Sequence, residues 1–236
     1  TSIEAVLRPG EVAPLHWPAI DKGNSDLVQI RLDIPDCAWS GNIVMEGRSM
    51  YTVTLMETTT RTRYFVRIMP RLHAETGIST IIFKQEDHRS PLFKIENQLP
   101  IPLQLQQAGL DPNRFPHASD TVTSFHTRIW GWHNPHTMEQ GVELTIGSSK
   151  NNKIDRNFSL TKVKTYPSFP IRLEGGGKMD VIVTVSTDKS TRVLRVQPAH
   201  SYDASRSGVD NRQDAGSPQQ RRVATVQERN SSTANP

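Results

Sequence analysis

The stretch Pro91-Leu92-Phe93-Lys94-Ile95-Glu96-Asn97-Gln98-Leu99-Pro100-Ile101-Pro102-Leu103 decides the fold class of this chain. The apolar residues that alternate on either side of Asn97 are Phe93, Ile95, Ile101, Leu103 and Leu105. Alternation with period two is typical of half-buried strands, so the stretch predicts two strands joined at a polar bend. An asparagine amide both donates and accepts hydrogen bonds, so we expect Asn97 to hold the bend in place.

Landmarks on both sides of this stretch recur in the same order and at nearly the same spacing. The recurring pairs are Trp17 with Trp132, the alternating segments 27–32 and 142–146, Trp39-Ser40 with Phe158-Ser159, and 79–83 with 191–196. Such a repeat predicts two copies of one β-rich unit in tandem. We expect the first unit over 1–125, with the Asn97 bend, and a second, truncated unit over 126–198.

The remaining strand signals agree with an all-β chain. Short β-branched or aromatic runs are separated by turn residues, with no helical pattern between them, which predicts tandem antiparallel β-sandwich modules. The expected strands are 28–34, 43–45, 50–55, 64–69, 79–84, 92–95, 101–106, 142–146, 158–163, 171–173, 180–187 and 191–196. From Ala199 onward large apolar side chains are almost absent, so we expect a disordered tail or linker over 199–236.

The net charge of +4 is spread along the chain, and its densest basic stretch lies on one expected strand. Arg61, Arg63, Arg67 and Arg71 recur partly at period two, so three of them would share one strand face. A solvated face and contact with anionic lipid headgroups both fit this pattern. No aromatic residues interleave with the arginines on that face, which disfavours nucleic acid as a partner.

Catalytic and metal-binding patterns are scarce. The chain has no nucleophile elbow, phosphate-binding loop or dinucleotide fingerprint, so we expect neither an enzyme nor a bound cofactor. His126, His133 and His136 cluster, but no carboxylate or thiolate partner has suitable spacing for zinc. We therefore assign no catalytic residue and no metal ligand, and expect Cys37 to pack in or near the core.

The four tryptophans are expected to anchor the cores, with ligand stacking as the alternative. They are Trp17, Trp39, Trp130 and Trp132. The single cysteine indicates a reducing compartment, and no signal peptide or membrane span is apparent. The start at Thr1 suggests a fragment of a longer chain.

Several of these segments together resemble the adaptor-binding region of the vacuolar protein sorting-associated protein 13 family. The matching segments are Leu7-Arg8-Pro9-Gly10, Pro14-Leu15-His16-Trp17, Pro91 to Asn97, Trp132-His133-Asn134-Pro135 and Thr191-Arg192-Val193-Leu194. Members of this family are long, bridge-like lipid transporters at membrane contact sites. Their adaptor-binding region is a string of β-sandwich modules with an asparagine in an Ile-x-Asn setting, which here is Ile95-Glu96-Asn97, preceded by Pro91.

The resemblance implies a protein-interaction module that binds Pro-x-Pro peptides of membrane adaptors along a sheet edge. Asn97 would then be the adaptor-module asparagine, and the chain would be cytoplasmic and peripheral at organelle contact sites. Two alternatives stay open: a structural β-repeat of a large scaffold, and a membrane-surface module that uses the four arginines.

Overall fold

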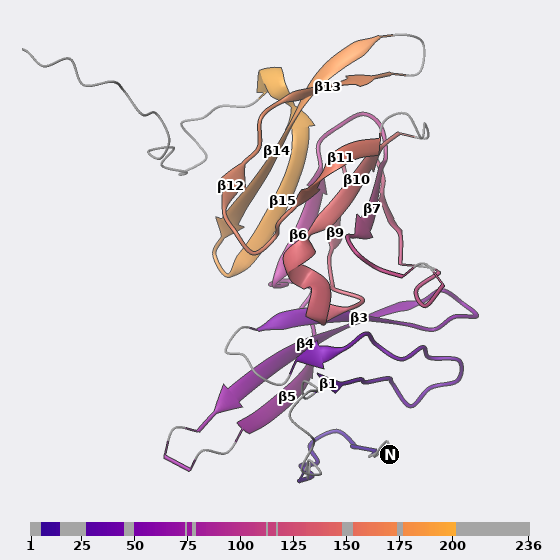
Figure 1. Ribbon diagram of the computed structural model, residues 1–236, viewed down its shortest axis with the longest axis vertical. Helices are drawn as coiled ribbons and strands as arrows, with labels where there is room; N and C mark the ends of the chain where they lie inside the picture. The colour runs from indigo at the N-terminus through magenta and orange to yellow at the C-terminus, as the bar shows by residue number, and fades with distance from the viewer. Residues whose placement is uncertain are drawn as a thin grey trace, which may run out of the picture.

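The computed structural model describes residues 6–14, 27–44, 50–73, 75–76, 79–111, 113–116, 118–147, 153–173 and 177–201 (Figure 1). Its strands are β1 (Leu27–Val28), β2 (Ile43–Val44), β3 (Tyr51–Met56), β4 (Arg63–Leu72), β5 (Ser79–Gln85), β6 (Phe93–Asn97), β7 (Leu103–Gln107), β8 (Asp120–Val122), β9 (Thr127–Ile129), β10 (Val142–Ile146), β11 (Lys153–Phe158), β12 (Lys164–Thr165), β13 (Phe169–Arg172), β14 (Lys178–Asp188) and β15 (Thr191–Pro198). Two short 3-10 helices, η1 (Pro135–Gln140) and η3 (Ala199–Ser201), are the helical elements of the described residues. The all-β expectation is therefore confirmed.

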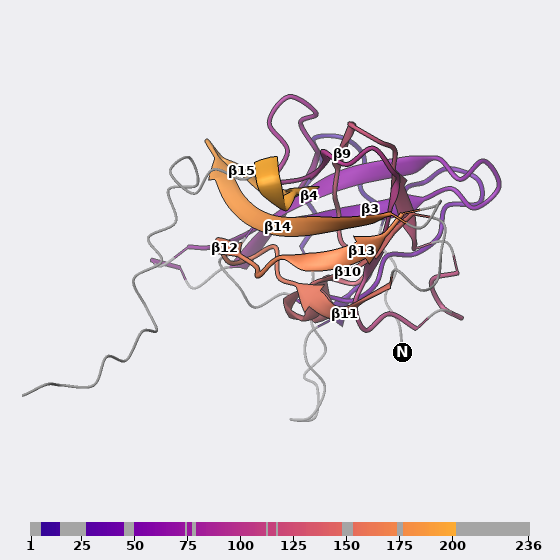
Figure 2. The same cartoon turned by 90° about the horizontal axis from the view of Figure 1, so that it is seen from above.

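Two sheets stack face to face in the upper body of the molecule. One has the order β12-β14-β15-β6-β9, with β13 also on β14, and the other has the order β11-β10-β7-β8. In Figure 2, β13 and β14 lie on one side of the sandwich, and β10 and β11 lie on the other. Side chains on the inner faces belong to one buried cluster, which includes Ile95, Leu105, Leu144 and Val183. Alternating burial along β6, β7 and β10 follows from the period of two in their sequences.

The preceding strands build a separate antiparallel sheet, β3-β4-β5, below this sandwich (Figure 1). β3 is buried along its whole length, and its two edges pair with β4 and with Trp132. β4 and β5 are longer and more exposed, and β1 pairs with β2 beside them.

The segment 130–134 joins the lower sheet to the sandwich. The Trp132 backbone amide donates to the Thr52 carbonyl at 2.8 Å, and its carbonyl accepts from the Thr54 amide at 3.0 Å. Trp132 therefore forms a parallel bridge beside β3 and widens the lower sheet. On the same segment, the His133 carbonyl accepts from the Gly41 amide at 2.7 Å. The Trp132 ring packs edge-on against Phe93 of β6, with ring centroids 5.9 Å apart. The lower sheet and the sandwich therefore share one core.

The sheets cross the predicted boundary at residue 125. β15 pairs in parallel with β6, and β10 pairs with β7, so strands on both sides of that boundary build the same two sheets. The division that the pairing shows lies instead between β5 and β6. Residues 202–236, most of the predicted tail, lie outside the described residues, as does Trp17.

Individual strands differ from the prediction in three places. The expected strand 158–163 is wrong: β11 ends at Phe158, and 160–162 form a bend. Within the expected strand 28–34, only Val28, the second residue of β1, pairs with another strand. β8, β9 and β12 were not expected, because two or three residues are too short to show a period.

We predict that Gly131→Ala lowers the free energy of unfolding by about 1–3 kcal/mol, because the segment beside β3 has no room for a side chain. A Cβ atom at Gly131 would lie 2.5 Å from Thr54 Oγ1 and 3.1 Å from the Thr54 amide nitrogen. Chemical denaturation measures the change.

The control is Gly177→Ala, where the nearest atom to a new Cβ is 3.6 Å away on Leu173. That variant should stay within about 0.5 kcal/mol of the parent. Equal unfolding midpoints for the two variants would contradict the close contact between 130–132 and β3.

Candidate functional site

The Asn97 side chain lies at the end of β6, where it is 2% exposed. Its Nδ2 group donates to three carbonyls, those of Ile101 at 2.8 Å, Val122 at 3.1 Å and Thr123 at 3.0 Å. Its Oδ1 accepts from the Leu99 amide at 3.0 Å. One buried amide therefore fixes both the loop that follows β6 and the turn between β8 and β9.

The turn over 123–126 presents an exposed aromatic residue. Phe125 is 69% exposed and has a φ of 58°. This left-handed conformation is unfavourable for a bulky side chain and persists where neighbouring contacts enforce it. The Phe125 amide donates to the Leu99 carbonyl at 3.3 Å, and the His126 carbonyl accepts from the Asn97 amide at 2.9 Å. The hydrogen bonds around Asn97 therefore hold Phe125 toward solvent.

β9 follows this turn and forms one edge of its sheet. Arg128 lies opposite Ile95, between the bonded positions Asn97–His126 and Phe93–Trp130. Antiparallel strands bond at every second pair, so the backbone groups of Arg128 face β6, and those of Thr127 and Ile129 face away. No strand of the described residues pairs with that outer side.

The other residues of the predicted motif have supporting positions. Ile95 is fully buried, and Pro91 is buried before β6 begins. Glu96 bonds to Lys94 at 2.8 Å and to Arg195 of β15 at 2.7 Å. Partial burial raises the pKa of Glu96. Hydrogen bonds and positive charge from Lys94 and Arg195 lower it by more, so the pKa lies below its usual value. Glu96 thus ties β6 to β15.

The four arginines do not form a free basic surface. Arg63 is paired with Asp120 and donates to the Ser119 carbonyl at 2.7 Å. Arg67 is paired with the buried Glu86, with Nε 2.9 Å from Oε1. Arg61, in a loop with a φ of 58°, and Arg71 are exposed. Half of the charge proposed for lipid headgroups is therefore offset within the molecule.

The tryptophans divide between core and surface. Trp130 and Trp132 are buried and pack edge-on at 6.0 Å, as expected of core anchors. The prediction is wrong for Trp39, which is 45% exposed, with the Arg31 guanidinium 4.8 Å from its ring centre. Its chain neighbour Ser40 is the residue that turns inward and is buried, and Trp39 points the other way.

No group of metal-binding side chains occurs among the described residues. His126 Nδ1 lies 2.7 Å from the Ser124 carbonyl, and His136 is exposed. His133, in contrast, is buried, with 6% of its surface exposed. Burial lowers the pKa of His133 to about 4, and the charge of Arg63 lowers it in the same direction.

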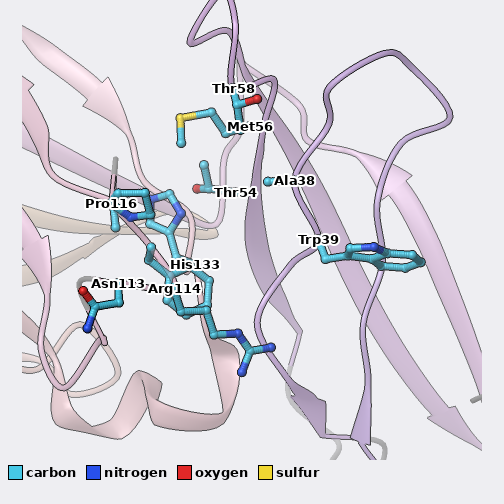
Figure 3. Close-up of a pocket in the computed structure, with 11 residues that line it drawn as sticks. Ala38, Trp39, Thr54, Met56, Thr58, Asn113, Arg114, Pro116 and His133 are labelled. Carbon is cyan, nitrogen blue, oxygen red and sulfur yellow. The ribbon is translucent and has the colours of Figure 1, made fainter.

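His133 lines a cavity of about 280 Å³ between β3 and the loop residues 113–116 and 118. Figure 3 shows Met56 and Thr54 on one side of it, with Pro116 and His133 close together on the other. Its walls are mainly apolar, and the Trp39 indole extends from the rim.

Neither Phe125 nor this cavity was expected from the sequence. An exposed phenylalanine looks the same in sequence as a core phenylalanine, and the cavity joins segments far apart along the chain. A usable signal was the run Ser124-Phe125-His126, where one aromatic residue interrupts a polar turn.

We predict that Asn97→Ala lowers the free energy of unfolding by about 1–3 kcal/mol, because it leaves buried carbonyls without donors. Asn97→Asp should be at least as damaging at neutral pH, since it turns a carboxylate toward three carbonyls, and should recover partly in acid. Denaturation at two pH values measures both. Asn157→Ala, on an exposed position of β11, is the matched control. Equal stability of Asn97→Ala and the control would contradict the role of the amide.

We also predict an acid-dependent loss of stability from His133. Its pKa in the folded chain is about 4, against 6.5 for the free side chain, so the unfolded chain binds the proton first as the pH falls. The contribution of neutral His133 to the free energy of unfolding is complete above about pH 6.5. It falls by up to about 3 kcal/mol as the pH decreases toward 4. His133→Gln should flatten the stability–pH curve, whereas His88→Gln, at an exposed turn, should not. Parallel curves for both variants would refute it.

Among the described residues, none of the helices is long and apolar enough to cross a membrane. No family model matches the chain. Its sequence is 26% identical over 152 residues to the human intermembrane lipid transfer protein VPS13D, covering 64% of this chain and 3% of that protein. It is 32% identical over 108 residues to the Dictyostelium discoideum intermembrane lipid transfer protein vps13D, covering 44% of this chain and 2% of that protein. The chain thus spans a small fraction of the relatives it matches. These two matches show that the chain is similar to a region of intermembrane lipid transfer proteins of the vacuolar protein sorting-associated protein 13 family, which is the family that the motifs predicted.

Proposed function

We propose that this chain is an adaptor-binding module, which recruits a bridge-like lipid transfer protein to organelle membranes by binding Pro-x-Pro peptides along the outer edge of β9. The observation that carries the proposal is that Asn97 fixes an exposed Phe125 directly beside that edge. The parent protein would then act in the cytoplasm, peripherally at membrane contact sites.

The spacing of a Pro-x-Pro peptide suits this edge. In an added strand, alternate residues turn their amide and carbonyl groups toward the sheet. Proline has no amide hydrogen, so two prolines separated by one residue can both face away while the middle residue bonds. Thr127 and Ile129 offer the outward backbone groups, and Phe125 offers an aromatic surface for a proline ring.

The membrane-surface alternative has less support. Arg63 and Arg67, the two central arginines of its basic face, are engaged with Asp120 and Glu86. A purely structural β-repeat remains the competing reading, and it predicts no affinity for the peptide.

We expect a labelled peptide with one Pro-Val-Pro motif to bind the full chain saturably, as measured by fluorescence anisotropy. N-methylation of the valine removes the one amide that faces the edge and should weaken binding at least tenfold. Phe125→Ala should weaken binding without unfolding the chain, because this side chain is exposed. Phe83→Ala, at a surface phenylalanine of β5, is the control.

Flat titrations from a folded chain would reject the proposal in favour of a structural repeat. Binding to anionic vesicles at low salt, with no peptide binding, would favour a membrane-surface module instead. Equal affinity for the N-methylated peptide would reject strand addition as the binding mode.

A further inference from the structure

The cavity beside His133 is separate from the β9 edge, because Phe125, Thr127 and Ile129 are not among the residues that line it. Its volume of about 280 Å³ falls just below the range of ordinary small-molecule sites, which begins near 300 Å³. A space of that size suits one large side chain of a peptide. Met56, Phe115 and Ala118 give it apolar walls.

His133 adds a polar group to these walls without adding charge. The residue is 6% exposed, and no hydrogen bond of its ring occurs within the described residues. Its low pKa keeps the imidazole neutral at physiological pH, so an apolar side chain could enter without burying an unpaired charge.

The cavity has one charged side chain at its rim. Arg114 lines it, and none of the described lining residues is an aspartate or glutamate. The Arg114 side chain stacks over Phe115 at 5.4 Å and makes no ion pair within the described residues. Figure 3 shows its guanidinium extending away from the loop. On the other rim, Arg31 lies over Trp39. A carboxylate beside an inserted side chain would meet the Arg114 guanidinium.

We propose that this cavity is a second peptide-binding site, which takes one large apolar side chain from an acidic segment of a partner protein. The apolar walls give the anchor, and Arg114 selects an acidic flank. The site does not depend on the β9 edge, so a partner could use either site or both.

The test uses the full chain and labelled peptides in which glutamates flank one central leucine, methionine, phenylalanine or tryptophan. We expect at least one of them to bind at least tenfold more tightly than the peptide with central alanine, because burial of a large apolar side chain is worth that factor. The same peptide with lysine flanks should not bind. Arg114→Glu should weaken binding about tenfold, and added salt should weaken it too.

Arg89→Glu, at another exposed arginine, is the matched control. Side-chain NMR of His133 provides a local readout, since an inserted anchor should shift its ring resonances. Binding of the Pro-Val-Pro peptide in the Arg114→Glu chain should be unchanged, which separates failure of this site from failure of the β9 edge.

Three results would overturn the proposal. One is that no central side chain improves on alanine. Another is that Arg114→Glu and Arg89→Glu weaken binding equally, which would indicate general attraction of anions. The last is binding without any shift of the His133 ring, which would place the peptide elsewhere.

Discussion

The contact of Trp132 with the edge of β3 is the constraint on which the rest of the structure depends. Its backbone bonds to Thr52 and Thr54 close the edge of the lower sheet, while its ring packs on Phe93 at the start of the sandwich. Gln107 supports the same segment, because its Oε1 accepts from the His133 amide at 2.9 Å and its Nε2 donates to the Asn134 carbonyl. The two parts therefore share a core and order the segments that carry both candidate sites.

Local pattern was enough to predict most strands of the sandwich, but not how they pair. Alternation in 93–105 and 142–146 shows strands because each has one buried face, whereas 181–185 is buried on both faces and shows as a continuous β-branched run. The parallel pairing of β6 with β15 joins residues about a hundred positions apart, and no local signal encodes it. The predicted boundary at 125 failed for that reason. Phe158-Ser159-Leu160 imitates a strand, yet Leu160 reaches the core from a bend.

The same division holds for the candidate site. Asn97 stands out in the sequence as a polar residue between two alternating runs. Its side-chain amide predicts use as both donor and acceptor. Its bond to Leu99 is local and follows from the bend. Its bonds to Val122 and Thr123 depend on how the two sheets stack, so the turn that presents Phe125 could not be foreseen. The sequence identified the residue that organises the site, whereas the contact surface required the fold.

An open sheet edge favours unwanted pairing, and short edge strands limit this risk. β9 has three residues, of which two face outward, so a general strand gains few main-chain bonds there. A proline-containing peptide loses less conformational entropy when it extends, because its backbone is already restricted. Under the proposed function, a weak edge of this kind would favour a preorganised peptide over an ordinary strand. The short edge and the fixed Phe125 together explain how such a module could bind Pro-x-Pro segments without aggregating.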